Sequence, residues 1–416
     1  NPNTGNAPTF RTRRDAAINL AMYHRASILW RDGDPKWNVW GIRFSAMIHM
    51  ASDSSQFRTH AELETAGWHR EENRFRRESA TMLPLIEAKM VSQFDHRFGT
   101  YEGATQAHYN KGFLPHFGDE EHADPYRVAW PDCWIDEAQV NAALHDRWNR
   151  EWLLGWRDIA IRTNVRTVIA VIVPRAAVGH TMPLMFPSAK PPRVACLYAN
   201  LCSFALDYAA RQKVGGSHLT YGYLKQLPVL PPQTWDGDTP WSRGTPLVDW
   251  MLPRVLELTY TAWDLEAFGA DVGYAGPPFR WDAERRSWLR AELDAAFFHL
   301  YGLSRDDTAY VMETFPIVKR NDEKDYRSYR TKDRVLTVYD AMAEVTRGGR
   351  VYATRLDPPP ADPQVAHPRR VVAAVDLTTL PDEAWARPNV DPEGELGALF
   401  VALLRVSGTA LPMRLM

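Results

Sequence analysis

The chain has 416 residues, of which 45% are hydrophobic and 24% are charged, with a formal net charge of −2; this composition is typical of a folded protein of two or three domains and excludes a disordered chain. The longest apolar run, Val168 to Pro174, is far shorter than the ~20 residues that span a bilayer, and the sequence starts without a secretory pattern, so we expect no membrane partner. Three cysteines without a CxxC pair exclude a disulfide framework, and we expect buried thiols in a cytoplasmic protein.

The N-terminal half is predicted to mix helices and strands. Residues 1–10 are turn-formers without periodicity and are typical of a junction to a preceding domain that this chain lacks. A helix is predicted from Arg11 to His24, and another over 194–211, which Gly215 and Gly216 would end. Segments rich in Val, Ile and aromatic residues predict strands at 82–96, 166–174 and 182–186.

The C-terminal half is predicted to be helical after a polar linker at 237–246. The charged stretch 318–334 is expected to be a solvated loop. Apolar spacing and capping residues predict helices over 248–265, 288–300, 306–314 and 331–345. We therefore expect an α+β protein with a mixed α/β region at 1–232, a helical domain at 245–350, and a Pro-rich connector and C-terminal segment at 351–416.

Positive charge is concentrated between Arg147 and Lys225, a segment that we call the basic block. It contains eleven Lys or Arg and three acidic residues, a net charge of +8. Such a block is typical of a nucleic-acid surface, because phosphate contacts release counterions, and the arginine fork can bind phosphate or the guanine edge. The alternative is a solvated basic face without a partner.

The end of the basic block, 213–225, has features of a loop that follows a phosphate backbone. Gly215 and Gly216 would let the backbone approach a ligand closely. His218, Tyr221 and Tyr223 can form hydrogen bonds or stack. The alternative is a turn stabilised by aromatic packing.

Methyl-transfer motifs are missing from this sequence. Methylation of an exocyclic amine needs an Asn/Asp/Ser-Pro-Pro-aromatic turn and a Gly-rich turn that holds the methyl donor. The nearest string, Asp357-Pro358-Pro359-Pro360, has proline where the aromatic residue should stack, so we interpret it as linker.

A metal-dependent nuclease is the enzymatic alternative. Glu87 and Lys89, expected in a strand, resemble the Glu-x-Lys half of a core in which a carboxylate binds Mg²⁺. Only Asp53 is placed to supply the further acid. The run 116–122 lacks metal-ligand spacing, and 95–97 is more typical of a buried hydrogen-bonded corner.

Several blocks of the sequence, in order, resemble the C-terminal half of large adenine-specific DNA methyltransferases of the type IIG kind, found in restriction-modification and phage-defence systems. The resemblance covers roughly residues 1–345. The blocks that carry it are 10–16, 83–103, 155–184, 198–231 and 290–307.

The resemblance implies that this chain is the target-recognition half of such an enzyme. An absent N-terminal domain would bind S-adenosylmethionine, hold the flipped adenine and transfer the methyl group, so this chain alone would be non-catalytic and would hold no cofactor. Its partners would be double-stranded DNA, that methyltransferase domain and other defence-system subunits; a purely structural interaction domain is a further alternative. The DNA-contact candidates are Lys89, Arg97, Arg157, Arg162, Arg166, Arg175, Lys213, His218, Tyr221, Tyr223 and Lys225.

Overall fold

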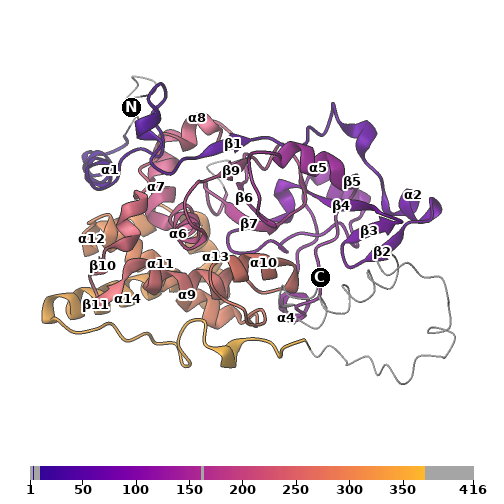
Figure 1. Ribbon diagram of the computed structural model, residues 1–416. Coiled ribbons are helices and arrows are strands. Elements are labelled where there is room, and N and C mark those ends of the chain that lie inside the picture. Colours follow the sequence, from indigo (N-terminus) through magenta and orange to yellow (C-terminus); the bar gives the residue numbers. More distant parts are fainter. Residues whose placement is uncertain (1–2, 4–9, 161–163, 371–416) are drawn as a thin grey trace, which may run out of the picture. The chain divides into compact units, whose positions relative to one another are not determined.

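Two antiparallel sheets form the first half of the molecule and a set of helices forms the second, which confirms the α+β class (Figure 1). The computed structural model describes residues 3, 10–160 and 164–370. No helix in these ranges is both long enough and apolar enough to cross a membrane. The expected junction at 1–10 lies almost wholly outside the described residues, as does the C-terminal segment after 370.

The central sheet has the strand order β1-β9-β6-β7. β6 and β7 are buried almost throughout, as the run of apolar residues requires. Gly155 is needed in β6 because a Cβ there would lie 2.8 Å from Met182 Cε and 2.9 Å from Pro183 O. The strands are β1 (Arg43–Ser45), β6 (Trp152–Trp156), β7 (Ala170–Pro174) and β9 (Leu184–Phe186), so the strands expected at 166–174 and 182–186 are confirmed in shorter form.

The second sheet has the order β2-β3-β4-β5, with β8 pairing parallel to β4. The strand expected at 82–96 was too long: it ends at Ile86, because Ala88–Met90 forms a 3-10 turn in which Met90 N donates to Glu87 O. The strands are β2 (His69–Glu71), β3 (Arg74–Arg77), β4 (Ala80–Ile86), β5 (Trp134–Asp136) and β8 (Ala177–Val178).

The helix expected over 194–211 is two helices that meet at Ser203. The extended backbone of Ser203 (ψ 148°) interrupts the helix, and its hydroxyl caps the second one by accepting from Leu206 N at 3.2 Å. The helix at 11–24 is confirmed. In this half the helices are α1 (Arg13–Arg25), α2 (His60–Thr65), α3 (Gln106–Lys111), α4 (Asp119–Ala123), α5 (Glu137–Leu144), α6 (Pro191–Cys202), α7 (Phe204–Lys213) and α8 (Tyr221–Leu224).

The charged stretch 318–334 is helical, so the expectation of a loop was wrong. Its charges pair across helices: Lys319 binds Glu313 at 2.9 Å, and Arg330 and Arg334 both bind Glu284. The remaining helices are α9 (Leu247–Thr259), α10 (Glu266–Asp271), α11 (Ala283–Leu300), α12 (Arg305–Glu313), α13 (Pro316–Tyr326) and α14 (Arg330–Gly348), with 3-10 turns at Pro35–Trp37, Ser54–Gln56, Ala88–Met90, Pro232–Asp236, Trp263–Leu265 and Pro363–Val365.

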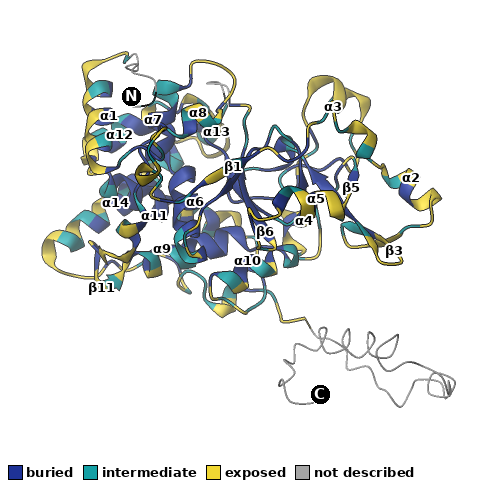
Figure 2. Ribbon diagram, turned by 45° about the horizontal axis from the view of Figure 1, so that its top comes forward, coloured by how far each residue is buried: buried dark blue, intermediate teal, exposed yellow. Residues whose placement is uncertain are grey.

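One hydrophobic core runs through both halves, and its buried residues extend from Ile18 to Ala366 (Figure 2). α6 packs against α9 across the boundary that we expected between 232 and 245, so the core does not divide there. The expected linker at 237–246 is a hairpin of β10 (Asp238–Thr239) and β11 (Ser242–Pro246). The chain up to His367 forms one unit.

Trp241 anchors that hairpin to the helices. It is 1% exposed, its ring lies 5.1 Å from the Trp250 ring, and its carbonyl accepts from Tyr352 N at 2.7 Å. We predict that Trp241→Ala lowers the free energy of unfolding by about 3–5 kcal/mol, measured by urea denaturation, because a large buried ring is removed. Arg243→Ala, at an exposed position of the same hairpin, should stay within about 0.5 kcal/mol of the wild type. Equal effects would show that the hairpin is not packed.

Asp294 joins α11 to α7, since its carboxylate accepts from Phe204 N at 2.7 Å. Burial raises the pKa of Asp294 to about 6, although Arg166 and Arg290 act in the opposite direction. In the unfolded chain this carboxyl loses its proton near its ordinary pKa of 3.8. Its neutral form therefore adds stability that is complete below pH 3.8 and is lost as the pH rises to about 6.

Asp294→Asn should keep the hydrogen bond from Phe204 N. Because the amide does not ionise, the variant should not lose stability as the pH rises from 3.8 to about 6. We expect the variant to be more stable than the wild type above pH 6, by at most about 3 kcal/mol, with the difference shrinking towards pH 4. Thermal unfolding measured from pH 4 to 8 tests this, with the exposed Asp325→Asn as control. A pH-independent difference would contradict the assignment.

Candidate nucleic-acid interface

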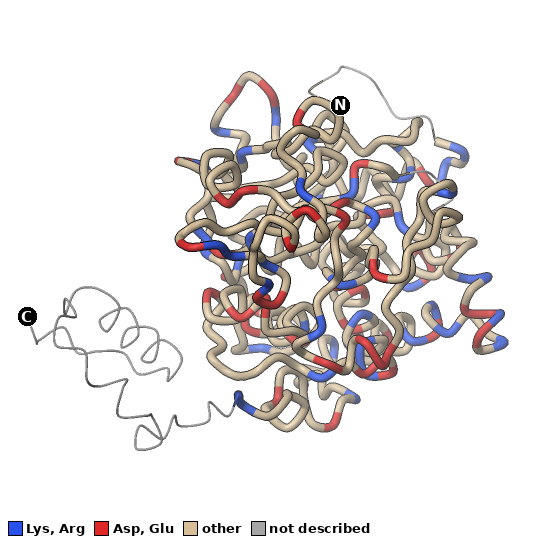
Figure 3. Tube along the Cα trace, turned by 90° about the vertical axis from the view of Figure 1, so that its right-hand side faces the viewer, with Lys and Arg blue, Asp and Glu red and all other residues tan. Residues whose placement is uncertain are grey.

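The basic block does not form a bare positive surface, because five of its ten described Lys and Arg residues form ion pairs. Arg150 binds Asp271 at 2.8 Å, Arg193 binds Asp236 at 2.7 Å and Lys225 binds Asp32 at 2.7 Å. Figure 3 shows basic and acidic positions interspersed along the chain. Acids from other segments therefore neutralise part of the charge excess of the block.

Arg97 and Arg166 are removed from the DNA-contact candidates. Arg97 has no exposed surface, and its guanidinium donates to the carbonyl oxygens of His122, Asp124, Arg127 and Thr261 at 2.7–3.2 Å. Arg166 is 8% exposed and pairs with Asp207 at 3.0 Å. Arg97 is closed to a phosphate of the DNA backbone, and Arg166 already has a carboxylate partner.

Other candidates remain partly accessible but have protein partners. Lys89 binds Glu87 at 3.5 Å and lies 4.8 Å from the centre of the Tyr101 ring. Arg175 donates to Asn141 Oδ1 at 2.7 Å. Arg157 is half-buried, and burial lowers the pKa of its guanidinium. Arg162 lies outside the described residues.

The loop at 213–225 combines aromatic packing with an exposed tip. The ring of Tyr221 lies 5.1 Å from that of Phe44 and 5.6 Å from that of Trp156, so this residue belongs to an aromatic cluster; Tyr223 is half-buried. Lys213 is half-buried over the Tyr23 ring, and burial lowers its pKa. These three side chains are shielded in part by the protein itself.

The tip itself is open to solvent. Gly215 and Gly216 are exposed with no positive φ, and a Cβ at either position would meet no atom within 4 Å. The local backbone therefore does not require glycine. His218 is exposed and bonds to Asp158 Oδ2 at 2.6 Å.

The nuclease alternative lacks its metal site in the described part of the chain. Glu87 lies after β4 rather than in it, and its carboxylate is bonded to the Tyr101 hydroxyl and to Lys89. In the run 116–122, His122 uses both ring nitrogens, on Gly118 O and Asp95. Across the described ranges no three His, Cys, Asp or Glu residues are grouped so that they could hold a metal ion.

A mostly exposed cluster of arginines is one that we did not predict. It lies on the β2–β3 hairpin (His69–Arg77), which projects with α2 at one end of the molecule (Figure 1). β2 is exposed along its whole length and forms the edge of its sheet. Only Phe75 is buried, in a small cluster with Leu63, Met82 and Trp134. The signal in the sequence was the string HREENRFRRE, with five Arg or His among ten residues.

Both faces of the β2–β3 hairpin carry guanidinium groups. On the face of Phe75, Arg70 lies 4.4 Å from the ring centre of Trp130 and Arg77 lies 5.0 Å from that of Trp68. Strand alternation places Arg74 and Arg76 on the opposite face. Comparisons with known proteins found no family model, no curated protein and no solved structure that matches this chain.

We predict that Arg97→Met destabilises the fold without a specific effect on DNA. Four buried carbonyl groups would lose their donor, and one unsatisfied group alone costs about 1–3 kcal/mol, so we expect a decrease of at least about 3 kcal/mol in the free energy of unfolding, measured by urea denaturation. Arg13→Met, at an exposed position, should be nearly neutral. Unchanged stability together with weaker DNA binding would return Arg97 to the DNA-binding candidates.

Proposed function

We propose that this chain recognises a sequence in double-stranded DNA for an adenine-specific methyltransferase of restriction-modification or phage defence in the cytoplasm. The methyl group would come from S-adenosylmethionine in a catalytic domain outside this chain. The observation that carries the proposal is the β2–β3 hairpin, an edge ribbon with arginines on both faces, of which Arg74 is half-buried and the others are exposed.

The dimensions and chemistry of this hairpin suit the major groove. A two-stranded ribbon fits the groove, which is about 12 Å wide. On its outer face, Arg74 can bind a phosphate or the O6/N7 edge of guanine with two parallel hydrogen bonds, and Arg76 can do the same by leaving its exposed ion pair with Glu71 (2.9 Å), since exposed ion pairs are weak. The tryptophans beneath Arg70 and Arg77 hold the opposite face in place.

The position of the hairpin in the sequence supports the same role. It lies between two of the blocks that resemble the methyltransferases, 10–16 and 83–103, and belongs to neither. In a family whose members read different targets, the residues that read bases are expected outside the shared blocks. His218 at the exposed tip of 213–225 is a further candidate for DNA binding.

Removing Arg74 and Arg76 together should weaken binding to duplex DNA. We expect Arg74→Ala/Arg76→Ala to reduce the affinity by about tenfold or more in fluorescence anisotropy with a labelled duplex, and to lower the slope of log affinity against log salt by about one for each phosphate that is no longer neutralised. If one of them reads a base, the binding free energy should fall by about 1–3 kcal/mol on the cognate site alone.

The matched control is Arg320→Ala/Arg347→Ala, which removes the same charge from exposed positions of α13 and α14. It should bind DNA almost as the wild type does. Absence of salt-dependent DNA binding by the wild-type chain would contradict the proposal. An equal decrease of affinity in the control would show that the hairpin arginines act only through the net charge of the protein.

A further inference from the structure

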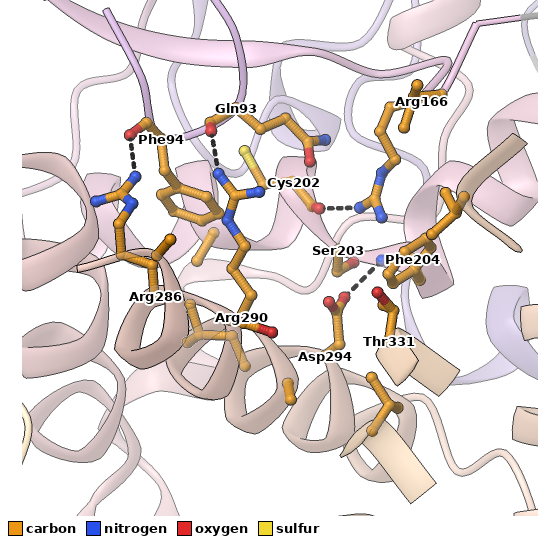
Figure 4. Close-up of a pocket in the computed structure, with 18 of the residues that line it drawn as sticks. Gln93, Phe94, Arg166, Cys202, Ser203, Phe204, Arg286, Arg290, Asp294 and Thr331 are labelled. Atoms are coloured by element: carbon orange, nitrogen blue, oxygen red, sulfur yellow. Dashed lines mark hydrogen bonds between the residues drawn. The ribbon is translucent and has the colours of Figure 1, made fainter. Parts of the chain in front are cut away.

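A cavity of about 320 Å³ opens between α11, the junction of α6 and α7, and the segment at Gln93 and Phe94 (Figure 4). None of its lining residues belongs to the β2–β3 hairpin or to the loop at 213–225. Three arginines line it: Arg166, Arg286 and Arg290. Few protein cavities contain so much charge of one sign unless a ligand or an acid balances it.

Two of these arginines are held by the protein. Arg166 pairs with Asp207 at 3.0 Å, bonds to Cys202 O and lies 3.6 Å from the ring centre of Phe204. Arg286 donates to the carbonyl oxygens of Phe94 and Leu258, each at 2.8 Å, and lies over the Trp281 ring. Both side chains are therefore fixed in direction, as a preformed site requires.

Arg290 forms fewer hydrogen bonds with the protein than the other two arginines. Its guanidinium donates to Gln93 O at 2.8 Å, whereas an arginine has five N–H donors. The residue is solvent-exposed, yet burial and the charge of Arg166 lower its pKa. Arg290 therefore lies at the solvent-accessible edge of the cavity, with protein packed against its other side.

The positive charge in this cavity is only partly balanced, by Asp207 on Arg166 and by the lining carboxylates Asp119 and Asp294. Neither Arg286 nor Arg290 forms an ion pair with a carboxylate within the described ranges, and Asp95 nearby is bonded to His122. Burial, with the charge of Arg290 adding to it, lowers the pKa of Arg286 to about 9. Asp294 accepts from Phe204 N, and its raised pKa of about 6 reduces the negative charge that it can offer. A bound anion would relieve the repulsion.

We propose that this cavity binds a phosphomonoester, with Arg290 contacting the phosphate and Arg166 and Arg286 supplying the surrounding field. A dianionic phosphate matches the two unpaired guanidinium groups, whereas a carboxylate would balance only one. The planar fork of arginine fits two phosphate oxygens. The hydroxyl groups of Ser287 and Thr331, which also line the cavity, can contact the remaining oxygens or the organic part.

The size of the cavity limits the ligand. Its volume lies at the lower end of the range of about 300–1,000 Å³ that is usual for small-molecule pockets. The rest of the wall is mostly apolar, with Ala199, Leu293 and Val335 among its residues. Two sources share the required chemistry: a free small phosphate ester and the 5′-phosphate at the end of a nucleic-acid strand.

Isothermal titration of the full chain tests the proposal with adenosine 5′-monophosphate and ribose 5-phosphate, and with adenosine and ribose as uncharged controls. The expected result is saturable binding of one or both phosphates and none of the uncharged compounds. Arg290→Gln should weaken it at least about tenfold, because charge-assisted hydrogen bonds are removed. Arg290→Lys should weaken it less, and Arg347→Gln, an exposed arginine outside the cavity, should match the wild type. Circular dichroism verifies the fold of each variant.

A second arm compares a short blunt duplex carrying 5′-phosphates with the same duplex without them. A difference that disappears in Arg290→Gln supports the strand end as the source, and binding of the free esters alone supports a small metabolite. The proposal is overturned if no phosphomonoester binds at millimolar concentration in either form, or if folded Arg290→Gln binds as tightly as the wild type.

Discussion

The buried guanidinium of Arg97 joins the two halves of the molecule through hydrogen bonds to both. Its N–H groups donate to carbonyl oxygens of the segment around α4 and to that of Thr261, which follows α9. Two ion pairs flank it, Asp95 with His122 at 3.1 Å and His96 with Asp264 at 2.8 Å. Desolvating these groups is costly, and they persist because almost every donor finds an acceptor. One short segment thus fixes how the sheets meet the helices.

Local signals in the sequence were sufficient for elements whose caps and periodicity agree. Thr12 caps α1 through Asp15, and Ser304 caps α12 through Asp307, as residue spacing alone indicates. Such local reasoning fails where ion pairs join residues that are far apart in the sequence. Arg150 finds its acid at Asp271, outside the basic block, so a charge that counts as positive in that window of sequence is neutral in the fold. Net charge along a sequence therefore says little about surface charge when its acidic partners lie in other elements.

The β2–β3 hairpin was missed for a related physical reason. Its two-residue loop, Glu72 and Asn73, lacks the glycine typical of such turns, and Glu72 adopts a positive φ of 53° instead. Its strands are charged at nearly every position, because most of the ribbon stands clear of the core and only Phe75 needs to be apolar. Hydrophobic alternation, which identifies half-buried strands, has nothing to detect in a ribbon exposed on both faces.

The arginines of the core and of the cavity can be ranked by how completely protein groups satisfy their N–H donors. Arg97 donates its hydrogen bonds to carbonyl oxygens, and Arg166 pairs with the carboxylate of Asp207. Their roles are therefore structural. Arg290 has one carbonyl at the edge of a water-accessible cavity. Because leaving a guanidinium under-bonded in a protein interior costs free energy, a fold retains one only where something compensates that cost. Satisfaction of donors, rather than the density of positive charge in the sequence, is therefore the better guide to which arginines hold this fold together.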